Sequence, residues 1–193
     1  MNEEEVVSGE VEAEADHMEV STYLARIGFE EKPNTSLDCL ARLQAAHQHA
    51  VPYENLDVFL GRKKVLEVGE LYKGMVVKGR GGWCCELNGL FCWLLQKVGF
   101  VVRMVSASYY MEEKQKYKEE FDHLALIVTI SEQVETEHNS KSHHYPPLVL
   151  EVGCGHHHHH HHHHCHHHMQ EYLVDVGWGQ ANQPLAPIRL VSS

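Results

Sequence analysis

The sequence lacks several features that would place it in a specialised class of protein. It has no run of about 18 apolar residues, so no membrane-spanning helix is expected. Its N-terminus has neither a basic segment nor an apolar segment after it, which predicts no secretory signal and a cytoplasmic location. Outside residues 1–19 it holds 19 acidic and 16 basic residues. A body so close to neutral has no basic patch for nucleic acid or for an anionic membrane.

Paired cysteines at the spacing of zinc knuckles or of a disulfide framework are missing as well. The six cysteines are spaced irregularly, and in a cytoplasmic protein we expect reduced thiols. A run of nine histidines, His156 to His164, is followed by Cys165 and three more histidines. This tract would retain metals such as zinc or nickel in vitro. Because a homopolymer supplies no defined geometry, we expect no biological metal site and no requirement for a metal.

The composition that is present is that of a globular protein with an acidic tail. The chain has 193 residues, of which 43% are hydrophobic and 22% charged, so it can form a core. Eight acidic residues and no lysine or arginine fall in residues 1–19, which predicts a disordered tail. We divide the rest into a helical domain over residues 20–99 and a β domain over 100–193, with a low-complexity insertion at 131–170.

The hydrophobic pattern changes from a helical period to a strand-like one near residue 100. Helices are predicted at Ser21–Ile27, Leu37–His49, Val68–Val77 and Cys85–Val98. Strands are predicted at Val101–Tyr110, Leu124–Ile130, Leu148–Val152 and Tyr172–Val176. Because helices come first and strands follow, the pattern favours the α+β class over alternating βαβ units.

One cysteine lies where a thiol is easily activated. Two glycines, Gly81 and Gly82, let the chain turn sharply before the last predicted helix, which places Cys84 at its N-terminus. The helix dipole and the free backbone amides there stabilise a thiolate, and the same amides can hold an oxyanion. Taken alone, this pattern fits a buried structural cysteine equally well, because free cysteines are commonly buried.

A histidine and an aspartate add to this hypothesis. His123 opens one predicted strand, and Asp175 lies at the end of another. Singly, such residues are more often structural, and an aspartate near a glycine is usually a turn former. Together they supply a nucleophile, a base and an orienting carboxylate in one chain.

Five sequence blocks together resemble the arylamine N-acetyltransferases. They occur in the order found in that family, and the resemblance extends from about Tyr23 to Leu190 apart from the insertion. The blocks are Tyr23–Phe29, Val51–Leu56 (Val-Pro-Tyr-Glu-Asn-Leu), Arg80–Cys84 (Arg-Gly-Gly-Trp-Cys), His123 before an apolar strand, and Val174–Gly179 (Val-Asp-Val-Gly-Trp-Gly).

The resemblance implies a fold and a set of site residues. The fold would be a papain-like cysteine-transferase core, with a helical N-terminal domain and an antiparallel β-barrel that is incomplete here. Cys84 would be the acetylated nucleophile, His123 its proton partner, and Asp175 the residue that orients His123. Arg80 and Glu54 would form a supporting pair behind the nucleophile loop.

The resemblance also implies substrates. Acetyl-CoA would donate an acetyl group to Cys84, and an arylamine, arylhydrazine or arylhydroxylamine would accept it in a ping-pong reaction. Tyr53, Tyr109 and Trp178 fall where similar proteins line the acceptor pocket, although all three also fit an ordinary core. The expected partners are therefore small molecules, and we expect a monomer.

The chain departs from the family at its C-terminus. Relatives continue well past the last block, whereas this sequence ends at Ser193, so we expect a fragment, a splice form or an incomplete gene model that lacks part of the coenzyme A site. Two alternatives stay open. One is a truncated, non-catalytic family member with a regulatory or metal-binding role, and the other is a different papain-like or transglutaminase-like acyl transferase.

Overall fold

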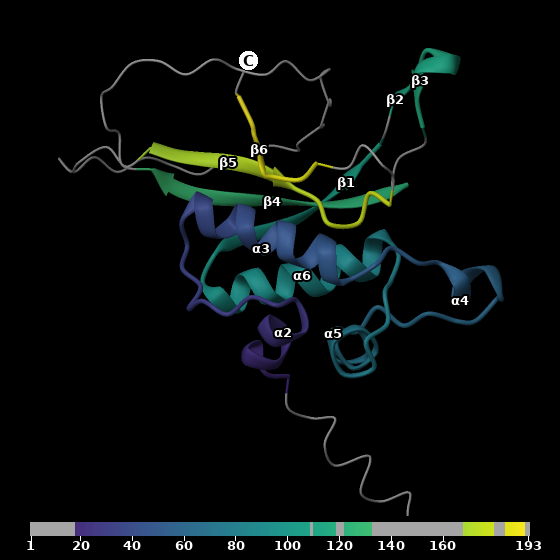
Figure 1. Cartoon of the computed structure of the whole chain (residues 1–193). Helices are drawn as coiled ribbons and strands as arrows, with labels where there is room; N and C mark the ends of the chain where they lie inside the picture. The colour runs from purple at the N-terminus through teal and green to yellow at the C-terminus, as the bar shows by residue number, and fades with distance from the viewer. Residues whose placement is uncertain (1–17, 109, 119–121, 133–167, 180–183, 192–193) are drawn as a thin grey trace, which may run out of the picture.

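The protein combines a group of helices with one main antiparallel sheet (Figure 1). A computed structural model describes residues 18–108, 110–118, 122–132, 168–179 and 184–191. The helical segments are α2 (Val20–Arg26), α3 (Leu37–Ala50), α4 (Leu56–Phe59), α5 (Val68–Tyr72), the π-helical turn η1 (Lys73–Val77) and α6 (Cys84–Val98). Among the helices of this described part, none is long and apolar enough to cross a membrane.

The strands follow the helices in the sequence and pair only with antiparallel neighbours. They are β1 (Val101–Ala107), β2 (Tyr110–Met111), β3 (Lys116–Tyr117), β4 (His123–Glu132), β5 (His168–Val174) and β6 (Ile188–Arg189), with a short 3-10 turn η2 (Glu112–Lys114) between β2 and β3. The main sheet has the order β1-β4-β5-β6, and β2 and β3 form a separate hairpin. The expected mixture of helices and an antiparallel sheet is confirmed.

The β domain was expected to be an incomplete barrel, and the described strands do not close into a barrel. β1 and β6 lie at opposite edges of the main sheet, so these four strands form an open sheet. A closed barrel of small diameter takes about eight strands, because each strand can tilt and twist only so far from its neighbour. The antiparallel pairing is as expected, and the four strands by themselves form an open sheet.

The predicted elements overlap the observed ones, but several of their bounds differ. β1 ends at Ala107, three residues before the predicted end, and the strand predicted at Tyr172–Val176 runs from His168 to Val174. α6 begins at Cys84, one residue before the predicted start, and the helix predicted at Val68–Val77 changes from α-helical to π-helical at Lys73. The two ends of the predicted 131–170 insertion belong to strands, because Ser131 pairs with Met169. The strand predicted at Leu148–Val152, the histidine tract and almost all of the acidic tail lie outside the described residues.

The core lies between α6 and the sheet. Five apolar side chains of α6 are completely buried at helical spacing: Leu87, Leu90, Phe91, Leu94 and Leu95. α6 packs against β1 and β4, while α2 and α5 cover its other side. Leu126 and Val128 of β4 belong to this core, whereas Ile127 packs with Leu173 in a second cluster. Both faces of β4 are thus buried, which explains why its sequence is apolar without alternation.

Candidate active site

Cys84 is the first residue of α6 and follows a loop that is held against a neighbouring segment. A side chain at Gly81 would place its Cβ 2.0 Å from the carbonyl oxygen of Pro52, so the two backbones approach too closely for any other residue. The Glu54 N–H donates to the Gly82 carbonyl oxygen at 2.9 Å, and this hydrogen bond holds the same two segments together. Gly81 is therefore required for space, and neither Gly81 nor Gly82 has a positive φ that would by itself favour glycine.

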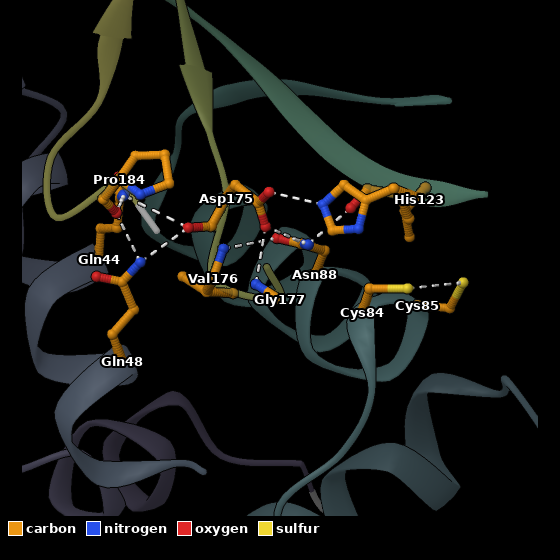
Figure 2. Close-up of polar contacts among 11 residues, drawn as sticks. Gln44, Gln48, Cys84, Cys85, Asn88, His123, Asp175, Val176, Gly177 and Pro184 are labelled. Carbon is orange, nitrogen blue, oxygen red and sulfur yellow. Dashed lines mark hydrogen bonds and ion pairs between the residues drawn. The ribbon is translucent and has the colours of Figure 1, made fainter. Parts of the chain in front are cut away.

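His123 and Asp175 come together at one end of the sheet. His123 begins β4, and Asp175 follows directly after β5, which pairs with β4 in antiparallel register. The start of one antiparallel strand lies beside the end of its neighbour, so the two side chains share this edge. His123 Nε2 lies 2.6 Å from Asp175 Oδ2, and only 9% and 5% of the two residues are exposed. Figure 2 shows the imidazole between Asp175 and Cys84.

The surroundings of Cys84 favour its thiolate. Burial by itself raises the pKa of the thiol, but hydrogen bonds from His123 and from the Leu124 backbone, the charge of His123 and a contact with Cys85 together lower the pKa below its ordinary value. A thiol with a lowered pKa thus lies at the helix N-terminus that the sequence indicated.

His123 is shifted in the complementary direction. Burial disfavours a charged imidazolium, but hydrogen bonds and negative charge from Asp175 and Cys84 outweigh burial and raise the pKa of His123 to about 9. The opposite shifts of Cys84 and His123 favour a thiolate–imidazolium pair, which is the reactive form of a cysteine nucleophile.

Asn88 connects the three elements that carry these residues, and no role was predicted for it from the sequence. Its Nδ2 donates to Asp175 Oδ1 at 2.9 Å and to the Leu124 carbonyl at 2.7 Å, and its Oδ1 accepts the Val176 N–H at 3.0 Å. The side chain is completely buried. Asn88 lies four residues after Cys84, hence on the same face of α6, and this spacing is the signal that could have revealed it.

Two glutamines of α3 hold the backbone of the Asp175 segment. Nε2 of Gln48 donates to the carbonyls of Asp175 at 2.9 Å and Pro184 at 2.8 Å, and Nε2 of Gln44 reaches the same carbonyls at 3.5 and 2.8 Å (Figure 2). Gln44 is completely buried. Its position one residue after Leu43, on the apolar face of the predicted helix, is the only signal for this contact in the sequence.

Gly177 allows the Asp175 segment to lie directly against the start of α6. A Cβ at this position would come within 2.7 Å of the Cys84 Cα and of the Asn88 amide nitrogen. The Gly177 N–H donates to Asp175 Oδ1 at 2.8 Å, so this carboxylate oxygen also accepts from the backbone. The glycine of the Val-Asp-Val-Gly block thus has a steric reason that involves the cysteine helix.

Curated proteins and a family profile resemble this chain along much of its length. It is 36% identical to mouse arylamine N-acetyltransferase 1 over 142 residues, which cover 70% of this chain and 48% of the relative. It is 31% identical to the chicken pineal gland isozyme NAT-3 over 178 residues, or 91% of this chain and 48% of the relative. The N-acetyltransferase profile matches residues 36–135, just over half of the chain.

The chain belongs to the arylamine N-acetyltransferase family. It spans about half the length of the curated relatives that it matches. Solved structures agree: the Mycobacterium smegmatis arylamine N-acetyltransferase superposes with a TM-score of 0.63 at 28% identity, covering 92% of this chain and 52% of that one. The Mycobacterium marinum protein in complex with CoA gives a TM-score of 0.62 at 26% identity, covering 91% and 52%.

The pair Arg80 and Glu54, expected from the family resemblance, is in contact. Arg80 Nε and Nη2 both donate to Glu54 Oε1, at 2.9 and 2.6 Å. Arg80 also lies 3.2 Å from Asp57, and Lys64 joins Asp57 to Glu86 at 3.1 and 2.9 Å. This network ties Glu54 and Asp57 to the first turn of α6.

Two of the three aromatic residues expected at an acceptor pocket lie near the cysteine. Tyr53 is 42% exposed, and a Cβ at Gly179 would meet its ring at 2.7 Å. Burial and the negative charges of Cys84, Cys85 and Asp122 raise the pKa of Tyr53. The Trp178 ring meets the His123 ring edge-on, with 5.1 Å between centroids. Tyr109 lies outside the described residues.

No metal centre is apparent in the part of the chain that the structure describes. Within it, no three His, Cys, Asp or Glu side chains gather as metal ligands would. The histidine tract with Cys165 lies outside that part. The expectation that no metal is needed stays a prediction.

Proposed function

We propose that this chain transfers acetyl groups from acetyl-CoA to arylamines, arylhydrazines or arylhydroxylamines through a thioester on Cys84. The observation that carries the proposal is the buried His123, held 2.6 Å from Asp175 and placed beside a cysteine whose pKa is lowered. Family membership adds the substrates, because curated relatives are named arylamine N-acetyltransferases and one solved relative holds CoA.

In the first half-reaction the Cys84 thiolate attacks the acetyl carbonyl carbon. The carbonyl π electrons move to oxygen, and the unpaired backbone amides of the first turn of α6 are suited to stabilise that oxyanion. The tetrahedral intermediate then collapses, its C–S bond to CoA breaks, and the CoA thiolate takes the proton of the His123 imidazolium. An acetyl-Cys84 thioester and neutral His123 remain.

In the second half-reaction the acceptor nitrogen attacks the thioester carbonyl. His123 takes the proton from the nitrogen, and Cys84 leaves as a thiolate, which restores the thiolate–imidazolium pair. Asp175 keeps one imidazole nitrogen hydrogen-bonded throughout, so the ring stays oriented toward Cys84. Tyr53 and Trp178 flank the site and would contact the aromatic ring of the acceptor.

The placement of the proposed catalytic residues corresponds to that of a papain-like enzyme. A cysteine begins a helix, and its histidine and carboxylate partners come from the sheet packed against that helix. Asn88, Gln44 and Gln48 act in this proposal as positioning residues, because they contact Asp175 or the backbone beside it and leave the reacting atoms to Cys84 and His123.

The decisive experiment is the intact mass of the purified chain with acetyl-CoA, before and after an arylamine such as aniline is added. We expect one acetyl group on Cys84 that disappears as N-acetylaniline forms, and no adduct on the Cys84→Ala variant. A folded chain, by circular dichroism, that gains no acetyl group would contradict the proposal and support the non-catalytic alternative. A stable adduct that no amine removes would support a different acyl transferase.

A further inference from the structure

Two adjacent thiols meet at the start of α6. Cys84 and Cys85 are the first two residues of the helix, and their Sγ atoms lie 3.9 Å apart. Successive residues of an α-helix point about 100° apart, so this contact needs both side chains to turn toward each other. Figure 2 shows the two sulfurs side by side, joined by a dashed line. A disulfide bond is about 2.05 Å long, so the two sulfurs are in contact without being bonded.

The two thiols differ in their protonation. Burial and the negative charge of Cys84, with the hydrogen bond between the two sulfurs, raise the pKa of Cys85 to about 12. Cys85 therefore keeps its proton at neutral pH, whereas Cys84, whose pKa is lowered, ionises more readily. The pair thus combines a thiol that ionises readily with a protonated thiol in contact with it.

We propose that Cys84 and Cys85 together form a dithiol site for trivalent organoarsenicals, which are thiophilic acceptors with two exchangeable ligands. Soft thiolate ligands suit such acceptors. A single arsenic atom between the sulfurs bonds to both and requires no S–S bond, so the observed separation fits bridging far better than it fits oxidation. This proposal concerns the same cysteine as the proposed function, but no step in it depends on acetyl transfer.

The reaction is an exchange of ligands at arsenic. The Cys84 thiolate displaces hydroxide from R–As(OH)₂, which forms the first As–S bond. Cys85 displaces the second hydroxide, and its proton leaves with that hydroxide as water. Counted from two thiols, two S–H and two As–OH bonds give two As–S bonds and two waters. Arsenic stays trivalent, and neither sulfur is oxidised.

The other described cysteines are poorly placed for this reaction. Cys39 is 1% exposed and Cys92 is 3% exposed, and both belong to the apolar core. Cys85 is partly exposed and gives a reagent its approach to the pair. Cys154 and Cys165 lie outside the described residues, so the experiment must test them separately.

The test uses phenylarsine oxide and the full-length chain. We expect one phenylarsenic group per chain, retained in excess 2-mercaptoethanol and released by 2,3-dimercaptopropanol, because two thiols of the reagent compete with two of the protein. Peptide mapping should place the arsenic on the peptide that contains both Cys84 and Cys85. Bivalent attachment typically strengthens binding by 10²–10⁴-fold, so Cys85→Ser should weaken it by about that factor.

The matched control is the double variant Cys154→Ser with Cys165→Ser, which should bind like the unaltered chain. Loss of tight binding in this control, or arsenic mapped to any other cysteines in the unaltered chain, would overturn the proposal. So would a Cys85→Ser variant that binds as tightly as the unaltered chain. The mapping needs no variant, so the result does not depend on how Cys85→Ser folds. Intact-mass acetylation, measured separately, distinguishes failure of this site from failure of the proposed function.

Discussion

Two buried histidines lie in different regions of the molecule and are held in opposite charge states. His47 lies in the helical core, where it is completely buried and its Nδ1 is 2.9 Å from the hydroxyl of Tyr23. Burial and the positive charge of Arg26 lower the pKa of His47 to about 3. His123 is almost as buried at the junction of helix and sheet, yet its pKa is raised to about 9.

The difference shows what decides the charge of a buried imidazole. Both rings lose most of their contact with water, which disfavours the charged form in each. Only His123 has a carboxylate in hydrogen-bond contact and a thiol that ionises beside it. The helical core thus favours a neutral histidine, whereas the junction of helix and sheet favours a charged one.

Replacing Asp175 by Asn should break this contrast and have the largest effect. The side chain keeps its shape but loses its charge, so the pKa of His123 should fall below about 9 and that of Cys84 should rise. Acetylation by acetyl-CoA should slow by about 10⁴-fold, as expected when the orienting carboxylate of such a triad is neutralised. Histidine NMR titration and the acetylation rate measure the two effects. Asp38→Asn, on the exposed side of α3, is the control. A His123 that still titrates near 9 would contradict the assignment.

Replacing His47 by Gln should make the free energy of unfolding less sensitive to acid. As the pH falls below about 6.5, the unfolded chain takes up a proton on His47 that the native chain does not, so stability decreases toward the native pKa of about 3. The loss should reach about 3 kcal/mol at pH 4, and the variant should lack it. Urea unfolding at pH 7 and pH 4 measures this. Replacing the exposed His49 by Gln should leave the loss of stability between pH 7 and pH 4 unchanged. Equal acid sensitivity of the unaltered chain and His47→Gln would refute the prediction.

Replacing Asn88 by Ala should loosen the junction while leaving the helical core intact. Asp175, Leu124 and Val176 each lose a buried hydrogen-bond partner, which should lower the free energy of unfolding by about 1–3 kcal/mol. The pH midpoint of Cys84 alkylation should also rise, which a purely structural loss would not cause. Asn88→Asp should be worse than Asn88→Ala, because it places a second carboxylate against Asp175. An Asp variant as stable as the unaltered chain would argue against this network.

Replacing Gln44 and Gln48 by Leu should show that the two side-chain amides hold the same backbone carbonyls. Each single change should lower the free energy of unfolding by about 0.5–1.5 kcal/mol. The double variant should lose more free energy of unfolding than the two single variants together, because either amide alone can donate to the carbonyls of Asp175 and Pro184. A double-mutant cycle by chemical denaturation measures the coupling. Strict additivity would mean that the amides act independently.

Replacing Arg80 by Lys should have the smallest effect. Arg80 is 43% exposed, and salt screens exposed ion pairs. A lysine keeps one contact to Glu54 but cannot donate twice to it, so a slight loss of stability is expected at low salt and none at high salt. The urea midpoint at two salt concentrations tests this. A large loss that persists at high salt would show that the exposed network matters as much as the buried one.

Much of the fold could be predicted from local patterns. The apolar spacing of α6 and the apolar run of β4 indicated both elements, because each buries its side chains in a regular order. The change from α5 to a π-helical turn was not predictable, since no local residue type specifies it. The order of the strands in the open sheet was not predictable either, because it depends on how strands pair over the whole sheet.

The site was predictable to the extent that its residues stand in recognisable blocks. Cys84, His123 and Asp175 stand out by their neighbours in the sequence, and the structure brings them together at one edge of the sheet. Gln48 was missed because its partner Pro184 lies 136 residues away. The contact between Cys84 and Cys85 was missed for another reason, because adjacency in the sequence does not tell how two side chains turn.

The sequence by itself determined which side chains are available for chemistry and which element carries each of them. Only the tertiary structure decided their charges. His47 and His123 are the same residue type, and both begin from the same ordinary pKa. A buried ring takes its charge from the groups packed around it, and for His123 the decisive group is a carboxylate 52 residues further along the chain.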